Sequence, residues 1–293
     1  MSELQFFPAN WTRKSSVVLA SSVFILGVLP ASAHTLEKHF KVGPQPVVTI
    51  NNPDGKIVVR AWTKSEVMVV ADHVADKAEV DAQQSGNRVD LMTHALSEPA
   101  SPDDLKADLE ISVPEDAELQ IHNDAGEVNV LDVLGDMTVE TIAAGVDVED
   151  AAGYLTVKTV GGSFQCVRCA GRVEASSITG SFRFLDLRSY LVRAQTSKGD
   201  IFFTGEFLPN GDYKLKNYSG TIEVHFKPGD SFDLSATSVK GKVNNEAKLV
   251  PPDHPQHYMP KFGNALFGTF NAAGRARVEL SSFDGTINIL KQN

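Results

Sequence analysis

The residues between Gly126 and Phe203 repeat a pattern of apolar positions with a period of nine. A glycine or another small residue opens each block, and apolar residues follow two, four and seven places later, as in Val128, Val130 and Val133. Side chains two and four places apart share a face only on an extended strand, and an opening glycine suits a turn. Each block therefore predicts a short strand and then a corner, beyond which the residue at plus seven again faces inward.

Two blocks make 18 residues, enough for one flattened coil with two faces. Coils stacked about 4.8 Å apart would bury a continuous apolar stripe. The pattern thus predicts an all-β fold, a β-solenoid (β-helix) with coils of about 18 residues built from nine-residue half-coils. A hexapeptide β-helix is disfavoured because steps of six from Val128 reach Glu140, and a calcium-binding nonapeptide solenoid is disfavoured because the blocks lack G-G-x-G-x-D.

A column of short polar side chains supports this register. Each lies three places before an alternate block opening, and the column consists of Asn123, Thr141, Thr159, Ser177, Thr196, Asn217, Ser238 and Ser282. Such side chains bond nearby backbone groups at turns. We therefore interpret the column as satisfying turns, and a binding surface made of these residues is the alternative.

The rest of the chain keeps the β pattern less strictly. Residues 34–120 contain several alternating segments and predict an irregular β cap, in which Asn52 stands three places before Gly55 like a diverged copy of the repeat. Residues 121–293 hold the repeats. A proline-rich insertion at 245–268 interrupts them, and since proline breaks strand ladders, this segment is predicted to be a loop.

Several short motifs occur in an order that resembles one known family. They are N-N-P-D-G-K-I-V-V (51–59), A-W-T-K-S-E-V (61–67), I-S-V-P-E-D-A-E-L-Q-I (111–121) and the G-x-V-x-V repeats that follow. Over most of the chain, from about Phe40 to Leu290, the sequence is similar to the bacterial putative-adhesin family of β-strand-repeat envelope proteins, a domain of unknown function. The resemblance implies a β-solenoid exported to the cell envelope, and it brings no established catalytic residues.

Residues 1–33 have the pattern of a secretory signal peptide. Arg13 and Lys14 precede an apolar run at 17–29, and Ala-Ser-Ala at 31–33 is a small-x-small cleavage pattern. The run is shorter than the about 20 residues that a membrane span needs. We expect a mature chain beginning at His34, exported to the periplasm or cell surface, without membrane insertion.

The chain is acidic, with 37 Asp and Glu against 27 Lys and Arg and a net charge of −10. Nucleic acids and anionic membrane surfaces attract basic patches, and no basic cluster stands out in the sequence. The partners expected are therefore an envelope protein or a glycan, with a homo-oligomer left open.

Cys166 and Cys169 form the pair C-V-R-C, and both fall in inward positions of the repeat. An exported protein favours a disulfide between them, while buried free thiols and a redox or metal pair remain alternatives. Asp253, His254 and His257 supply the ligand types of a metal site, but a proline-rich loop does not hold them in place. We therefore predict no metal and no cofactor.

One outward column contains Asp136, Tyr154, Arg172 and Tyr190, and Phe202 is also predicted to face outward. Aromatic faces and a guanidinium, stacked on successive coils, suit a glycan or a protein partner. The alternative is a column that stacks on itself and stiffens the fold.

The function expected from these features is a non-enzymatic binding, adhesin-like or scaffold module of the cell envelope. A glycan-active lyase or hydrolase is one alternative, because β-helix enzymes use converging carboxylates. Here Asp147, Glu149 and Asp150 are close in sequence but straddle a corner. An envelope-stress sensor or adaptor that binds its partner through the 245–268 loop is a further alternative.

Overall fold

The computed structural model describes residues 36–251, 263–271 and 274–292. The chain divides into Met1–Ser32 and Ala33–Asn293, and the description below concerns the second unit. The predicted signal peptide and the candidate ligands Asp253, His254 and His257 lie outside the described residues. No helix within the described ranges is long and apolar enough to cross a membrane.

Strands make up 69% of the structure, and the described residues contain no α-helix. One short 3-10 turn, η1, spans Pro102–Leu105. The strands are β1 Leu36–Lys41, β2 Val47–Trp62, β3 Glu66–Asp72, β4 Ala78–Ser85, β5 Arg88–Ala95, β6 Asp108–Pro114, β7 Glu118–Leu131, β8 Met137–Thr141, β9 Gly145–Glu149, β10 Tyr154–Thr159, β11 Phe164–Val167, β12 Ala170–Ser177, β13 Phe182–Lys198, β14 Ile201–Gly205, β15 Asp212–Phe226, β16 Phe232–Ser238, β17 Val243–Asn245, β18 Asn264–Phe270 and β19 Ala276–Lys291.

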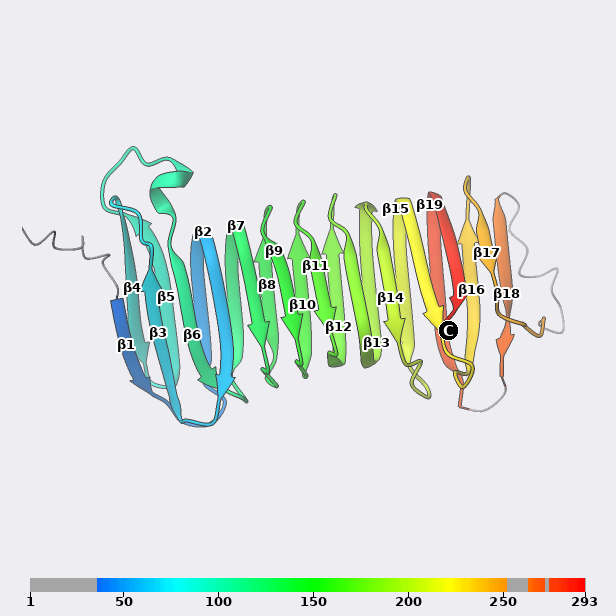
Figure 1. The fold of residues 1–293 in the computed structure, drawn as a ribbon, viewed down its shortest axis with the longest axis horizontal. Coiled ribbons are helices and arrows are strands. Elements are labelled where there is room, and N and C mark those ends of the chain that lie inside the picture. Colours follow the sequence, from blue (N-terminus) through cyan, green and yellow to red (C-terminus); the bar gives the residue numbers. More distant parts are fainter. Residues whose placement is uncertain (1–35, 252–262, 272–273, 293) are drawn as a thin grey trace, which may run out of the picture. The chain divides into compact units, whose positions relative to one another are not determined.

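Strands from the middle of the chain form a closed ring. β7, β8, β10, β12, β13, β11 and β9 pair in this order, all in parallel, and β9 pairs back with β7. The sheet therefore closes into a seven-stranded parallel barrel. Figure 1 shows these strands side by side in the centre of the row.

The predicted β-solenoid, a stack of 18-residue coils with an irregular cap, is therefore wrong. We expected each nine-residue block to end its strand at a corner. Instead β7 has 14 residues and β13 has 17, and both strands pair with neighbours on both faces. Gly126, at φ 100°, lets β7 turn while it continues to pair, a conformation that few other residues adopt. Pairing that runs through these two strands closes the sheet.

The pairing register places the apolar positions in one core between the two faces. Leu155 pairs with Met137 on one side and Val173 on the other, each 18 residues away. Alternate side chains such as Val139 and Val157 are fully buried. The barrel interior is therefore packed with side chains, as small barrels are.

The two kinds of corner differ in which residue points inward. At one corner Asp132, Asp150, Arg168 and Asp186 have positive φ angles of 53–62°, and the residue after each is buried. At the other corner the prediction that plus seven faces inward is wrong. Ile142, Val160 and Ile178 are 51%, 46% and 56% exposed, because the polar residue before each points toward the core instead.

That polar column fills turns, as the sequence indicated. Asn123, Thr159 and Ser238 are buried. The Thr159 hydroxyl accepts a hydrogen bond from the Gly162 amide at 2.9 Å, and the Ser238 hydroxyl accepts one from the Gly241 amide at 3.0 Å. The column is part of the interior and not a binding surface.

The ends of the row of strands are antiparallel. At one end β1 pairs with β3, β3 with β6, and β4 with β5. At the other end β18 pairs with β16. The 245–268 insertion is therefore not entirely a loop, since β18 begins at Asn264, and its residues 252–262 are outside the described part.

Candidate binding face

One side of the sheet carries a continuous set of charged and polar side chains. It comprises the outward residues of β8, β10, β12, β13, β15 and β19, and we call it the ladder face. Because paired strands lie about 4.8 Å apart, residues in register form rows across it. One such row is Lys158, Ser176, Gln195 and Lys216, each paired with the next on β10, β12, β13 and β15.

A shallow depression of about 320 Å³ lies in the ladder face, and we call it the cation trough. Its charged lining consists of Lys158, Arg193, Lys214 and Lys216 with the single acid Glu174. Thr156, Ser176 and Gln195 supply neutral hydrogen-bonding groups between them. The lining therefore has more cations than acids on a chain whose net charge is −10, although each of these cations is also paired with an acid.

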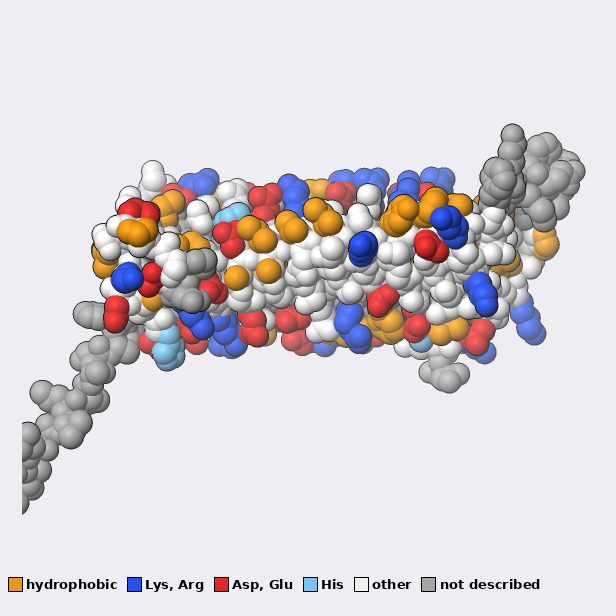
Figure 2. Space-filling model, turned by 90° about the horizontal axis from the view of Figure 1, so that it is seen from above, with side chains coloured by type: hydrophobic (Ala, Val, Ile, Leu, Met, Phe, Trp, Pro, Cys, Tyr) orange, Lys and Arg blue, Asp and Glu red, His pale blue; other side chains and the backbone are white. Residues whose placement is uncertain are grey.

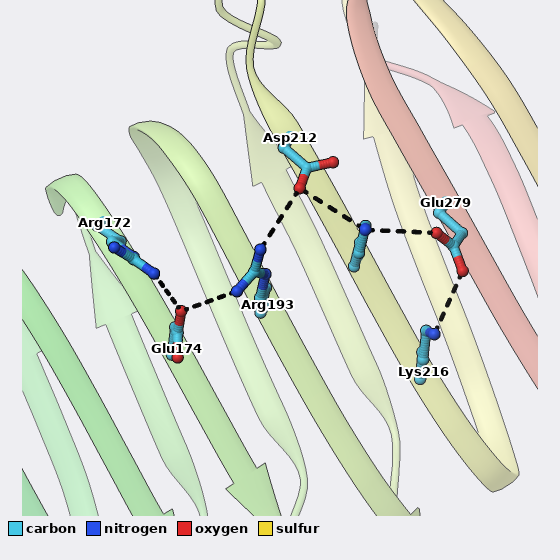
Figure 3. Close-up of polar contacts among 7 residues, drawn as sticks. Arg172, Glu174, Arg193, Asp212, Lys216 and Glu279 are labelled. Carbon is cyan, nitrogen blue, oxygen red and sulfur yellow. Dashed lines mark hydrogen bonds and ion pairs between the residues drawn. The ribbon is translucent and has the colours of Figure 1, made fainter.

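Ion pairs link the trough side chains from strand to strand (Figure 3). Glu174 lies between Arg172, at 3.0 Å, and Arg193, at 3.4 Å. The chain of contacts continues from Arg193 to Asp212 at 3.9 Å and from Lys214 to both Asp212 and Glu279, each at 3.8 Å. Lys216 ends it at 3.2 Å from Glu279.

These pairs put an acid beside each cation but leave the cations accessible to solvent. The side chains in the network are about a quarter to a half exposed, and ion pairs in water are worth only about 0–1 kcal/mol each. A ligand carboxylate can therefore share Arg193 or Lys216 with its protein partner at little cost. Four of the six pairs in the network join residues on neighbouring strands, and these contacts favour one orientation of the side chains before a ligand arrives.

Lys158 is fixed at the other end of the trough. Its ammonium lies 2.9 Å from the carboxylate of Glu140. The hydrogen bond between them raises the pKa of Lys158 and lowers the pKa of Glu140. Lys158 therefore stays charged at neutral pH and above.

The structure brings two of the three predicted binding residues together. Tyr154 pairs with Arg172 across β10 and β12, and the guanidinium lies 4.6 Å from the centre of the ring. Tyr190 is not in this column, because a bulge in β13 pairs Arg172 with Leu191. Tyr190 projects 56% exposed. Arg172 contacts Glu174 of the trough lining, so Tyr154 and Arg172 lie beside the cation trough. A binding role for Tyr154, Arg172 and Tyr190 stays a prediction.

Cys166 and Cys169 are joined by a disulfide between Cα atoms 6.0 Å apart. Both residues are buried, Cys166 in β11 and Cys169 just before β12. The bridge therefore crosses a corner inside the core. Among the described residues, no group of three or more His, Cys, Asp or Glu side chains is placed to hold a metal ion.

The opposite face carries Phe202, half-buried as an outward residue of β14. Its ring lies 5.2 Å from the imidazole of His225 and 5.2 Å from the guanidinium of Arg183. His225 also contacts Glu223 at 2.7 Å. Asp147 lines a separate depression on this face with Lys56 and Glu149, where burial raises the pKa of Asp147.

The cations of the trough also occupy outward positions of the repeat, but not the position that contains Tyr154. On the ladder face, β10 and β15 have three outward positions each, and the column that contains Tyr154 uses only the first. The third position gives Lys158 and Lys216, and the second gives Arg193 and Lys214. They are hard to find from the sequence because their spacings of 19 and 21 depart from 18.

No family model matches the chain, and no curated protein matches it. Solved structures of bacterial proteins do match. A structure described as a putative adhesin from Parabacteroides distasonis is 9% identical, covering 88% of this chain and 98% of that chain, with a TM-score of 0.36. A putative adhesin from Bacteroides fragilis is 12% identical, covering 90% and 100%, with a TM-score of 0.31. A protein from P. distasonis described as a putative lipid binding protein is 10% identical, covering 88% and 97%, with a TM-score of 0.32.

Proposed function

We propose that this chain is an exported, non-enzymatic binding module of the bacterial cell envelope that holds an acidic glycan on its ladder face. The observation that carries the proposal is the cation trough. Four cations converge there around neutral hydrogen-bonding side chains, although the chain as a whole is acidic. Carboxylated sugars need such a combination, because their charges require cations and their hydroxyls require neutral donors and acceptors.

The shape of the site favours a chain-like ligand over a small one. The trough is shallow and open to solvent, and its rows extend across paired strands. Lys158 and Lys216 are three strand steps apart, about 14 Å at the usual strand spacing. A ligand that contacts both must be extended, as an oligosaccharide is. Tyr154, with Arg172 over its ring, is two residues before Thr156 of the trough lining, and we expect its ring to border the bound sugar chain.

The test is calorimetric titration with oligogalacturonate, a carboxylated oligosaccharide, and with its methyl ester, which has the same sugars without charge. We expect the acid to bind and the ester to bind at least tenfold more weakly. Replacing Lys158, Arg193 and Lys216 together by Gln removes three exposed charge contacts of about 0.2–1 kcal/mol each, and should weaken binding about tenfold. Arg183→Gln, on the opposite face, is the matched control and should bind like the parent.

Two results would contradict the proposal. If the parent and the triple Gln variant bind the oligosaccharide with equal affinity, the cation trough is not the binding site. Oligosaccharide that is shortened after incubation with the protein would replace the non-enzymatic role with the glycan-cleaving alternative. Chromatography of the recovered ligand distinguishes the two.

A further inference from the structure

A single file of exposed apolar side chains follows one corner of the fold. It consists of the exposed residues Ile142, Val160, Ile178, Tyr218 and Val239 and the half-buried Phe283, and we call it the corner stripe. Ile178 and Tyr218 are each 56% exposed, and the corner residue between them is Ser197. Figure 2 shows hydrophobic side chains in such rows along the surface. The repeat predicted Ile142, Val160 and Ile178 to be buried, but all three are exposed, so the core does not account for them.

Pairing between successive strands keeps neighbouring residues of the stripe side by side. The Gly161 amide donates to the Ile142 carbonyl at 2.8 Å, and the Ile178 amide donates to the Val160 carbonyl at 3.2 Å. Farther along, Tyr218 and Phe283 stack with their ring centres 4.7 Å apart. The stripe crosses β8, β10, β12, β13, β15, β19 and β16, which is six steps, or about 29 Å at the usual strand spacing.

The surroundings of the stripe are small or basic at most positions. Ala143, Gly161 and Thr179 follow the three aliphatic residues directly and are exposed. Lys198 and Lys240 follow at later corners, and the Lys240 ammonium lies 5.1 Å from the centre of the Phe283 ring. Aliphatic side chains bordered by aromatic rings and lysines are typical of protein surfaces that rest in a lipid headgroup layer.

The geometry of the corner stripe favours a lipid surface over a second copy of the chain as its partner. The file lies on a convex corner, where its exposed side chains can meet a flat surface, whereas a folded partner would need a matching groove of that length. The file offers a few hundred Å² of apolar surface, on the order of half the about 800 Å² per partner that stable protein interfaces bury. A lipid layer deforms around side chains and has no such requirement.

We propose that the corner stripe is a peripheral docking surface for a zwitterionic phospholipid layer, with its side chains resting in the headgroup region. The chain's net charge of −10 opposes contact with anionic lipid, so apolar contact and not charge attraction holds the surface. The stripe is on a corner and the cation trough is on the adjacent face, and neither proposal depends on the other.

The test is flotation of the purified chain with vesicles of phosphatidylcholine alone and of phosphatidylcholine mixed with phosphatidylglycerol. We expect the parent to float with phosphatidylcholine, and less with the anionic mixture. Replacing Ile142, Val160 and Ile178 together by Ser should reduce the floated fraction at least tenfold. The matched control replaces Met92, Leu96 and Leu134 by Ser, three apolar residues off the stripe that are 50%, 58% and 51% exposed.

A second variant reports the contact directly. Ile178→Trp places an indole in the stripe, and its emission should shift to the blue when phosphatidylcholine vesicles are added. Each of three results would overturn the proposal: no flotation of the parent, equal loss in the control variant, or binding that requires phosphatidylglycerol and disappears in salt. Self-association that the stripe variant abolishes, without flotation of the parent, would assign the stripe to a second copy instead.

Discussion

At the scale of single residues, the inward positions of the repeat decide stability. Val157 on β10 is fully buried between the two faces of the barrel. Val157→Asp would place a carboxyl group in the core without a partner, and should lower the free energy of unfolding by about 3–5 kcal/mol. Urea denaturation followed by circular dichroism measures the change.

The control is Ser176→Asp, which adds the same group at an exposed position of β12 in register with Lys158. Surface substitutions usually change stability by less than about 0.5 kcal/mol. If Val157→Asp unfolds at the same urea concentration as this control, then Val157 does not face the core.

At the scale of elements, the edge strand β1 is attached partly by a titratable contact. His39 on β1 lies 2.7 Å from Glu66 on β3 and 2.9 Å from Glu37. These hydrogen bonds, Glu37 first, raise the pKa of His39 above its usual 6.5, and the bond to His39 lowers the pKa of Glu66. A raised pKa means that the folded state holds the proton more tightly. The His39 contribution is therefore complete below pH 6.5 and is lost as the pH rises through the folded pKa of His39, whereas the Glu66 contribution is lost as the pH falls through the folded pKa of Glu66.

Hydrogen-exchange protection of the β1 amides, corrected for intrinsic rates, measures this contact. We expect protection to fall between a pH below 6.5 and one well above it in the parent. His39→Gln should have the same, lower protection at both pH values. Protection in the parent that does not change with pH would show that the contact does not attach β1.

The elements also show how much the sequence could predict. Alternation placed the strands and their inward residues, since Leu155 and Val157 are buried as expected. It could not predict which residue turns inward at each corner, because that depends on the backbone angle of the residue before it. Asp150 adopts a positive φ, and the next residue is buried, whereas Thr141 fills its corner and leaves Ile142 outside.

The candidate site was harder to predict than the strands. Tyr154 and Arg172 were placed together correctly, because their spacing of 18 matches the register. The bulge in β13 moved Tyr190 out of that column, and bulges leave no periodic signal in a sequence. The same irregular spacing hid the cations on β13 and β15.

At the scale of the whole molecule, the closed ring predicts how the chain opens. In a stack of repeats that contact only their neighbours, opening can begin at an end and spread from unit to unit. Here β8, β10 and β12 share one core with β9 and β11, and β7 and β13 belong to both sets. Separating one set would expose apolar side chains of the other, including Phe164 and Val148.

We therefore expect both sets of strands to share one opening free energy in native-state hydrogen exchange, measured peptide by peptide in increasing denaturant. The amides of the edge strands β1 and β18 should exchange at lower denaturant concentration. β1 pairs with β3 and β18 with β16, and both strands carry partly exposed side chains. If peptides from β8 and β9 have the same opening free energy at every denaturant concentration, the ring opens as a unit. A gradient of opening free energies from β7 toward β13 would instead show that each strand is held only by its nearest neighbours, and that closure through β7 and β13 adds nothing to cooperativity.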